Sequence, residues 1–260
     1  MRRLLGSNAV KTKENERDVV TQADQEVQQI IQSYVKARHP DHAFLGEESV
    51  PPGTKNAADA ISDLLSSGSE FAWINDPVDG TMNSTRSLPL LSISTGVAFR
   101  GEMVCGIVAD PLRNEFFTAI KGKGAFLNDV PINVSSNDTL ESSIVGTGYG
   151  TSPGSAGPVS RAVGALTRAP VQSVRMLGSA ALMFAYTSAG RLDAYAEASL
   201  NSWDSSAGSL LVKEAGGEVT SLKDGSDYDL TTRAVIASNG HVHKRLQETL
   251  QSAGVTGLDE

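Results

Sequence analysis

The stretch WINDPVDGTMN at residues 73–83 places two aspartates, Asp76 and Asp79, on either side of a short stiff segment. Asp-Pro and Asp-Gly are common turn dipeptides, and the apolar run FAWIN before them favours a strand. A surface turn after a strand would therefore explain these residues on their own. A metal site would explain them equally well, because Pro77 has a fixed φ and holds the residue before it extended. Residues elsewhere in the chain must distinguish the two interpretations.

Composition and charge narrow the class of protein. The chain has 260 residues, of which 40% are hydrophobic and 20% charged, as in a globular protein. Its net charge of −8 argues against binding to a nucleic-acid backbone. The single cysteine, Cys105, permits no internal disulfide, and no apolar run approaches the roughly 18 residues that span a membrane. We expect a cytoplasmic protein that binds neither nucleic acid nor membrane, with an organelle as the alternative if the N-terminus is truncated.

The N-terminal half has a helical pattern followed by strands. Apolar residues three and four apart predict a helix over 21–37, and Thr21 and Asp24 have the spacing of a capping box at its start. A second helix is expected at 57–66, and the alternation over 90–134 predicts an antiparallel meander. The expected strands are HAFLG (42–46), FAWIND (71–76), LLSISTGVAF (90–99), EMVCGIVAD (102–110), EFFTAI (115–120) and GAFLN (124–128).

After about residue 140 the pattern changes to strands that alternate with helices, which favours a layered α/β arrangement. We therefore expect two subdomains. Residues 1–140 would be an α+β unit with an antiparallel sheet and most of the metal ligands, and residues 141–260 an α/β unit with Asp204 and the substrate contacts. The expected strands are SSIVGTG (142–148), VQSVRM (171–176), RLDAYAE (191–197) and AVIAS (234–238), and the helices are 159–167, 179–189, 203–217 and 240–251.

Further acidic residues stand at the ends of these elements. Glu47 and Glu48 follow an expected strand, Asp204 lies at the start of a helix, and Asp24 lies in the first turn of another. Each has an ordinary explanation: an exposed turn for Glu47, an N-cap for Asp204 and a capping box for Asp24. In α/β folds, however, residues beyond strand ends and at helix starts gather at one rim of the sheet.

Such a gathering of carboxylates predicts a cation site. Two carboxylates ~4 Å apart repel by ~4 kcal/mol at an effective dielectric near 20, so a cluster needs protons or cations. Oxygen ligands select magnesium, calcium or manganese, and the Val78 carbonyl could add one oxygen. Gly80 and Thr81 would open a helix, whose first amides form an anion site. Cations and an anion site at one point indicate phosphate chemistry.

The chain resembles the inositol monophosphatase family of magnesium-dependent, lithium-sensitive phosphatases. The acidic segments come in that family's order, and the match extends over nearly the whole chain. The matching segments are DVVTQAD (18–24) with Lys13 upstream, FLGEES (44–49), WINDPVDGTMN (73–83), RMLGSAA (175–181), DAYAE (193–197), WDSSAGSLLVKEAGG (203–217) and SNGHVH (238–243).

The resemblance implies a fold, a reaction and roles for individual residues. The implied fold is the layered αβαβα sandwich, assembled as a homodimer, and the implied reaction is hydrolysis of a small-molecule phosphate ester, most simply an inositol or similar polyol monophosphate. The implied catalytic residues are Thr81, Asp24 and Glu47, with Thr81 oriented by Asp24 to position the attacking water. The implied Mg²⁺ ligands are Glu47, Asp76, the Val78 carbonyl, Asp79 and Asp204. The phosphate would bind to Gly80 and Thr81. The alcohol part of the substrate would contact Glu197, Gly178, Ser179 and Ala180.

Two departures from the family pattern concern the N-terminus and the substrate pocket. Only twelve residues precede Lys13, where the family has a further helix, and Ser84 replaces an aromatic residue. Arg86 nearby could meet a second anionic group, although a solvated side chain is the simpler interpretation.

Alternative functions remain open from the sequence alone. Within the superfamily, the substrate could be histidinol phosphate or fructose 1,6-bisphosphate. A nucleotide-binding module on GTGYG (146–150) is a weaker alternative, because the glycine spacing does not match that of such sites. An inactive phosphate-binding protein is also weaker, because every expected ligand is present. A zinc site at His241 and His243 has only two histidines and no nearby cysteine.

Overall fold

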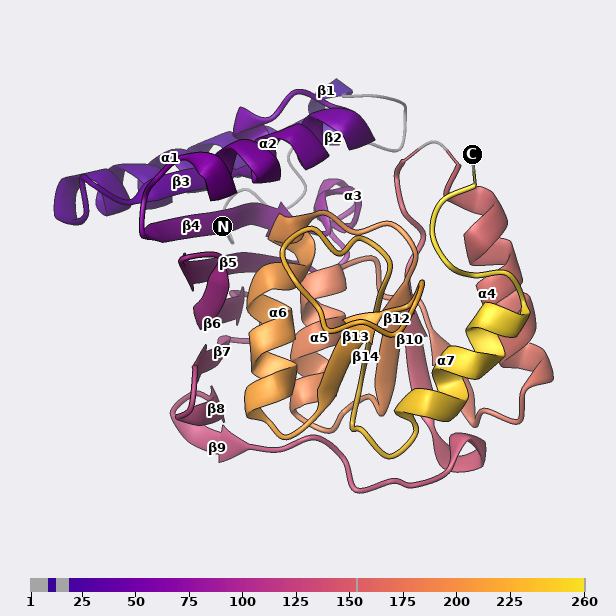
Figure 1. Ribbon diagram of the computed structural model, residues 1–260. Coiled ribbons are helices and arrows are strands. Elements are labelled where there is room, and N and C mark those ends of the chain that lie inside the picture. The colour runs from indigo at the N-terminus through magenta and orange to yellow at the C-terminus, as the bar shows by residue number, and fades with distance from the viewer. Residues whose placement is uncertain (1–8, 13–18, 153, 260) are drawn as a thin grey trace.

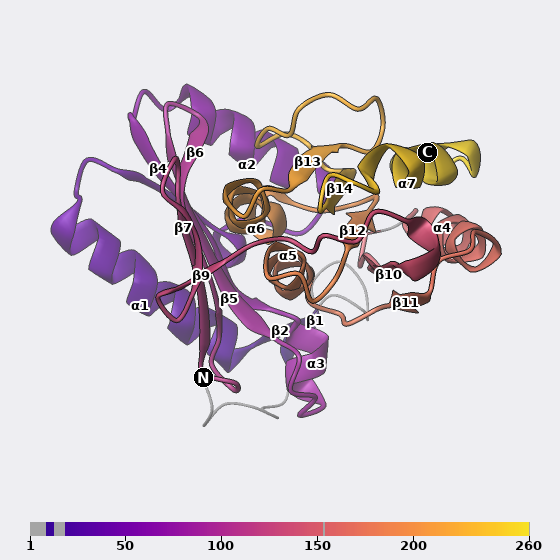
Figure 2. The ribbon, with the colours of Figure 1, turned by 90° about the horizontal axis from the view of Figure 1, so that it is seen from below.

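Helices and sheets alternate in five layers in the computed structural model, which describes residues 9–12, 19–152 and 154–259. Helices α1 (Gln22–Arg38) and α2 (Thr54–Ser66) lie next to the first strands of the first sheet (Figure 1), but on opposite faces of it (Figure 2). The face that α2 covers is the one where Ala72 and Ile74 also pack with Trp203. Helices α5 (Ala180–Ser188) and α6 (Ser202–Glu214) lie between the two large sheets, and α4 (Ala156–Arg168) and α7 (His243–Ser252) cover the far side of the second (Figure 2). This arrangement confirms the αβαβα sandwich.

The first sheet contains seven strands in the order β3-β4-β5-β6-β7-β8-β9. The pair β3–β4 is parallel, and every later neighbour is antiparallel, so the meander predicted over 90–134 is confirmed. The strands are β3 (Ala43–Gly46), β4 (Phe71–Asp79), β5 (Ser92–Phe99), β6 (Glu102–Asp110), β7 (Glu115–Ile120), β8 (Gly124–Leu127) and β9 (Val130–Ile132).

The second sheet contains five strands in the order β11-β10-β12-β14-β13. Strands β11, β10 and β12 run parallel, whereas β14 pairs antiparallel with both β12 and β13. Its strands are β10 (Ile144–Thr147), β11 (Ser173–Arg175), β12 (Ala194–Glu197), β13 (Glu218–Ser221) and β14 (Val235–Ser238). Strand β13 and the small pair β1 (Ala9–Thr12) and β2 (Val19–Thr21) were not predicted.

The helix starts follow capping chemistry. Thr21 caps α1 in a capping box with Asp24, as predicted. The interpretation of Asp204 as an N-cap is wrong: Asn201 has the extended backbone of the cap, and Asp204 is the third helical residue, whose side chain accepts from the Asn201 amide. The short helices are η1 (Glu47–Ser49), α3 (Thr81–Thr85) and η2 (Leu140–Ser142). Within the described residues, no helix is both long and apolar enough to cross a bilayer.

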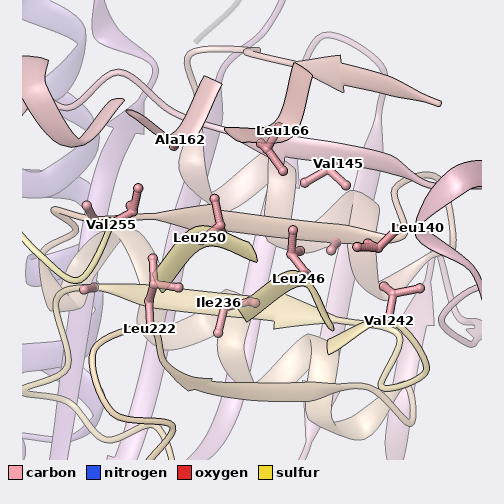
Figure 3. Packing of buried hydrophobic residues seen from close by; sticks show 14 residues of the cluster. Leu140, Val145, Ala162, Leu166, Leu222, Ile236, Val242, Leu246, Leu250 and Val255 are labelled. Carbon is pink, nitrogen blue, oxygen red and sulfur yellow. The ribbon is translucent and has the colours of Figure 1, made fainter. Parts of the chain in front are cut away.

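The layers determine which side chains form the core. Helix α5 is apolar on nearly every side, with Ala181 to Phe184 all buried, because sheets lie on both sides of it. Beyond the second sheet, α4 and α7 pack Leu166, Leu246 and Leu250 against strand residues such as Ile236 (Figure 3). Packing on both faces of both sheets holds the ends of β4, β10 and β12 close to the first turns of α3, α5 and α6.

Candidate active site

A cavity of about 230 Å³ opens where these strand ends and helix starts meet. Every residue that the sequence analysis assigned to the site lines this cavity except Asp24, which lies behind it. The wall also includes residues that the sequence did not indicate as part of a catalytic site: Met82, Asn83, the loop 148–152, Met183, Ser199, Leu200, Asn201 and Trp203.

Four carboxylates, those of Glu47, Asp76, Asp79 and Asp204, line one side of the cavity. Burial, and then the neighbouring charges of Glu47 and Asp79, raise the pKa of Asp76 well above its usual range. The pKa of Asp204 is raised in the same way, by burial and then by Asp79 and Glu47. The free protein therefore holds a group of acids whose charges repel one another.

Asp79 is held by the first turn of α5. Ser179 Oγ donates to its Oδ2 at 2.5 Å, the Ala181 amide donates to Oδ2 at 2.7 Å, and the Ala180 amide donates to Oδ1 at 3.2 Å. Burial raises the pKa of Asp79 to about 6, although these hydrogen bonds oppose the rise. Ser179 and Ala180, expected to contact the alcohol, thus also position a candidate metal ligand across 100 residues of sequence.

Asp204 is positioned by Asn201, which in turn is held by Arg233. The Asn201 amide donates to Asp204 Oδ2 at 2.6 Å, and Arg233 Nη1 donates to Asn201 Oδ1 at 2.7 Å. Burial lowers the pKa of Arg233, and the charge of Asp204 opposes that change. The sequence analysis missed Arg233 because no local motif marks it.

Thr81 and Asp24 form the contact that the resemblance implied. Thr81 Oγ1 lies 3.0 Å from Asp24 Oδ1 and 2.8 Å from the Val78 carbonyl, so its one proton is shared between two acceptors. The Thr21 amide and hydroxyl both donate to Asp24 Oδ2. Burial raises the pKa of Asp24 above its usual value. A hydroxyl at the cavity wall is thereby connected to a buried carboxylate.

Gly80 turns the chain into α3 at the cavity wall. Its φ is +94°, and a Cβ there would stand 2.8 Å from the Leu90 carbonyl and 3.2 Å from the Gly178 carbonyl. Only glycine fits this position without strain. Gly80 is the N-cap of a helix of five residues and Thr81 is its first residue, and the amides at such a helix start lack intrahelical acceptors.

Glu197 is buried rather than solvated, with 8% exposure. The Tyr195 hydroxyl donates to its Oε2, and burial raises the pKa of Glu197 to about 7. A Cβ at Gly148 would stand 1.6 Å from Glu197 Oε2, so this glycine makes room for the carboxylate. Gly148 and Gly150 of GTGYG therefore form the cavity wall beside Glu197, and α4 begins only at Ala156.

The chemistry of this donor set fits a hard divalent cation. All the candidate ligands are oxygens, and their buried negative charge needs compensation. Within the described residues, no three His, Cys, Asp or Glu side chains are arranged as a finished cation site. The donor set nevertheless keeps free acceptors for a cation, since Oδ2 of Asp76 and Oδ1 of Asp204 accept no hydrogen bond from the described residues.

The remaining sequence candidates among the described residues lie away from the cavity. The zinc interpretation is wrong: His243 is buried and bonded to Thr220 and Ser238, whereas His241 is exposed. Arg86 is exposed and does not line the cavity, which supports the solvated interpretation. Ser84 is buried, and Lys13 lies outside the described residues.

Comparison with known proteins links this geometry to a family. Residues 4–254 match the family model described as the inositol monophosphatase family. Inositol monophosphatase 2 of Solanum lycopersicum is 40% identical over 228 residues, which cover 86% of this chain and 82% of the tomato protein.

Solved structures show the same fold. An IMPase of Thermotoga maritima superposes with a TM-score of 0.84 at 31% identity, covering 98% of this chain and 91% of that one. An IMPase/NADP phosphatase solved with Mg²⁺ and phosphate has a TM-score of 0.81 at 24% identity, covering 100% of this chain and 91% of that one, which is a likeness of fold alone.

Proposed function

We propose that this chain, which belongs to the inositol monophosphatase family and is therefore a phosphatase, hydrolyses a polyol monophosphate with the help of bound Mg²⁺. An inositol monophosphate is the first candidate substrate. Glu47, Asp76, Asp79, Asp204 and the Val78 carbonyl would hold the cations.

The observation that carries the proposal is the group of buried carboxylates beside the start of α3. An acidic cavity repels phosphate unless cations separate the two. When bound, magnesium would neutralise phosphate oxygens, lower the pKa of water and stabilise the leaving oxygen. The amides of Gly80 and Thr81 lie at the same wall and would donate to the phosphate.

Thr81 and Asp24 would handle the proton of the attacking water. A water on the cavity side of Thr81 can pass a proton to Oγ1 as the hydroxyl proton moves to Asp24 Oδ1, 3.0 Å away. The water oxygen then forms a bond to phosphorus while the bond from phosphorus to the alcohol oxygen breaks. The alcohol leaves with that electron pair and takes up a proton.

A substrate panel with a metal titration tests the proposal. Phosphate release from an inositol monophosphate, histidinol phosphate, fructose 1,6-bisphosphate and p-nitrophenyl phosphate would be measured with Mg²⁺ and with excess EDTA. We expect activity only with Mg²⁺, and the highest kcat/KM for the inositol ester. Full activity in EDTA would rule out a role of Mg²⁺ in hydrolysis. A higher kcat/KM for another ester would rule out inositol monophosphate as the preferred substrate.

Asp79→Asn provides the matched test of the cation site. It should lower kcat by at least about a hundredfold and abolish the rise in unfolding temperature that Mg²⁺ produces in the wild type. Asp110→Asn is the control, because Asp110 is buried and hydrogen-bonded but lies outside the cavity. If Mg²⁺ still raised the unfolding temperature of the Asp79→Asn variant, Asp79 would be excluded as a ligand.

The remaining parts of the proposal concern assembly, inhibition and location. We include a homodimer, inhibition by lithium and a cytoplasmic location, with no nucleic-acid or membrane partner. Light scattering after gel filtration tests the dimer, and a monomer at micromolar concentration would refute it. Unchanged turnover at high millimolar lithium would refute the inhibition.

A further inference from the structure

A buried hydroxyl without a partner belongs to a residue of the cavity wall. Ser199 is 8% exposed and lines the cavity, yet its Oγ has no hydrogen-bond partner among the described residues. A buried polar atom without a partner costs free energy, and such atoms in native structures need an explanation. Its position beside the candidate catalytic groups indicates that a bound molecule supplies the missing hydrogen bond.

Other orphaned hydroxyls show why Ser199 differs. Ser84 and Ser206 also have a buried Oγ without a partner, but neither residue lines the cavity. Ser206 packs against the first sheet, where a Cβ at Gly96 would stand 2.8 Å from its Oγ. Among these three serines, only Ser199 is a residue of the cavity wall.

Glu197 and Ser199 adjoin the same space. Glu197 is the last residue of β12, Ser199 follows two residues later, and both line the cavity. A Cβ at Gly150 would stand 3.5 Å from the Ser199 Cβ and 3.7 Å from Glu197 Oε1. Because Gly150 has no side chain, this part of the cavity stays open between the Glu197 carboxylate and the Ser199 side chain.

The two groups complement a particular kind of alcohol. A carboxylate accepts hydrogen bonds, and a serine hydroxyl both donates and accepts. Glu197 Oε2 already accepts from Tyr195, which leaves Oε1 for a ligand. We propose that Ser199 is a specificity-determining residue, whose hydroxyl binds one hydroxyl of the substrate's alcohol part while Glu197 binds the neighbouring hydroxyl. The cavity then selects a polyhydroxylated alcohol. This inference rests on the proposed phosphatase function.

The test compares two substrates in wild type and Ser199→Ala. We expect kcat/KM for an inositol monophosphate to fall about two- to tenfold, mainly through KM, as for the loss of one neutral hydrogen bond. Turnover of p-nitrophenyl phosphate should stay unchanged, since an aryl group offers no hydroxyl. The unfolding temperature should hold or rise, because the variant removes an unsatisfied atom. Ser206→Ala is the matched control and should change neither substrate's kcat/KM.

Each other outcome overturns the proposal in a recognisable way. Equal losses on both substrates would mean that Ser199 shapes the cavity without recognising the alcohol. No loss on either would mean that the orphaned hydroxyl has no role in binding. Failure of the wild type to hydrolyse either ester would instead overturn the proposed function itself.

Discussion

Thr81 illustrates how one hydroxyl can serve the fold or the reaction. Its Oγ1 contacts both Asp24 and the Val78 carbonyl, and it is the first residue of α3. As a structural group it would only fasten a five-residue helix to β4. As part of the reaction it would carry a proton between water and Asp24. The two roles differ in whether its loss changes turnover or stability.

Replacing Thr81 by alanine should lower kcat by about 10²–10⁴-fold, the range for general acid–base assistance. The Mg²⁺ concentration for half-maximal activity should change little, because the hydroxyl carries no charge. Thr81→Ser keeps the hydroxyl and should keep most of the turnover. Steady-state kinetics over a Mg²⁺ titration provide the measurement. A stability loss of ~1 kcal/mol with normal kcat would identify a purely structural hydroxyl.

At the scale of elements, a glycine determines how closely α5 approaches α6. A Cβ at Gly208 of α6 would stand 2.4 Å from the Phe184 Cβ and 2.6 Å from its Cγ. Phe184 is fully buried, so it has no room to move away. Because α5 carries Ser179 at its cap and α6 carries Asp204, this contact also sets the distance between two sides of the site.

Gly208→Ala should destabilise the protein by about 1–3 kcal/mol, the cost of overpacking a well-filled core. Gly164→Ala in α4 is the matched helix control. Its Cβ would meet only the flexible Arg168 side chain, at 3.2 Å, so helix propensity should make that variant more stable by about 0.5–1 kcal/mol. Urea unfolding measures both. Equal effects of the two substitutions would show that α5 and α6 adjust freely.

At the scale of the whole molecule, buried acids make stability depend on pH. Burial raises the pKa of Glu197 from 4.5 to about 7. A raised pKa means that the folded state binds the proton more tightly than the unfolded chain does. Below pH 4.5 both states are protonated and Glu197 costs nothing; as pH rises towards 7 the unfolded chain ionises first, and folding loses stability.

Glu197→Gln should remove this loss in the metal-free protein. Glutamine keeps an acceptor for the Tyr195 hydroxyl but carries no charge. Between pH 4.5 and pH 8, the stability of the variant relative to wild type should therefore rise by up to about 3 kcal/mol. Urea unfolding in EDTA at several pH values measures it. If the difference in unfolding free energy between Glu197→Gln and wild type did not vary with pH, the raised pKa of Glu197 would be contradicted.

Local chemistry was sufficient to predict those parts of the structure that depend on neighbouring residues along the chain. The capping box of Thr21 and Asp24 and the meander from β5 to β9 follow from spacing and alternation. The same reasoning failed at the start of α6, because Asn201 and Asp204 are both good capping residues and only the backbone distinguishes them. The subdomain boundary near residue 140 stays a prediction.

The sequence by itself determined the layered fold and the acidic segments, because periodicity and motifs involve residues that are close together along the chain. Only the tertiary structure decided what each carboxylate contacts. The Ser179 and Ala181 groups that hold Asp79 are about 100 residues away, and Arg233 reaches Asn201 from another loop. The orphaned hydroxyl of Ser199 is equally invisible in the sequence. Hydrogen bonds and burial depend on distances between atoms, and those distances exist only once the two sheets have packed around α5 and α6.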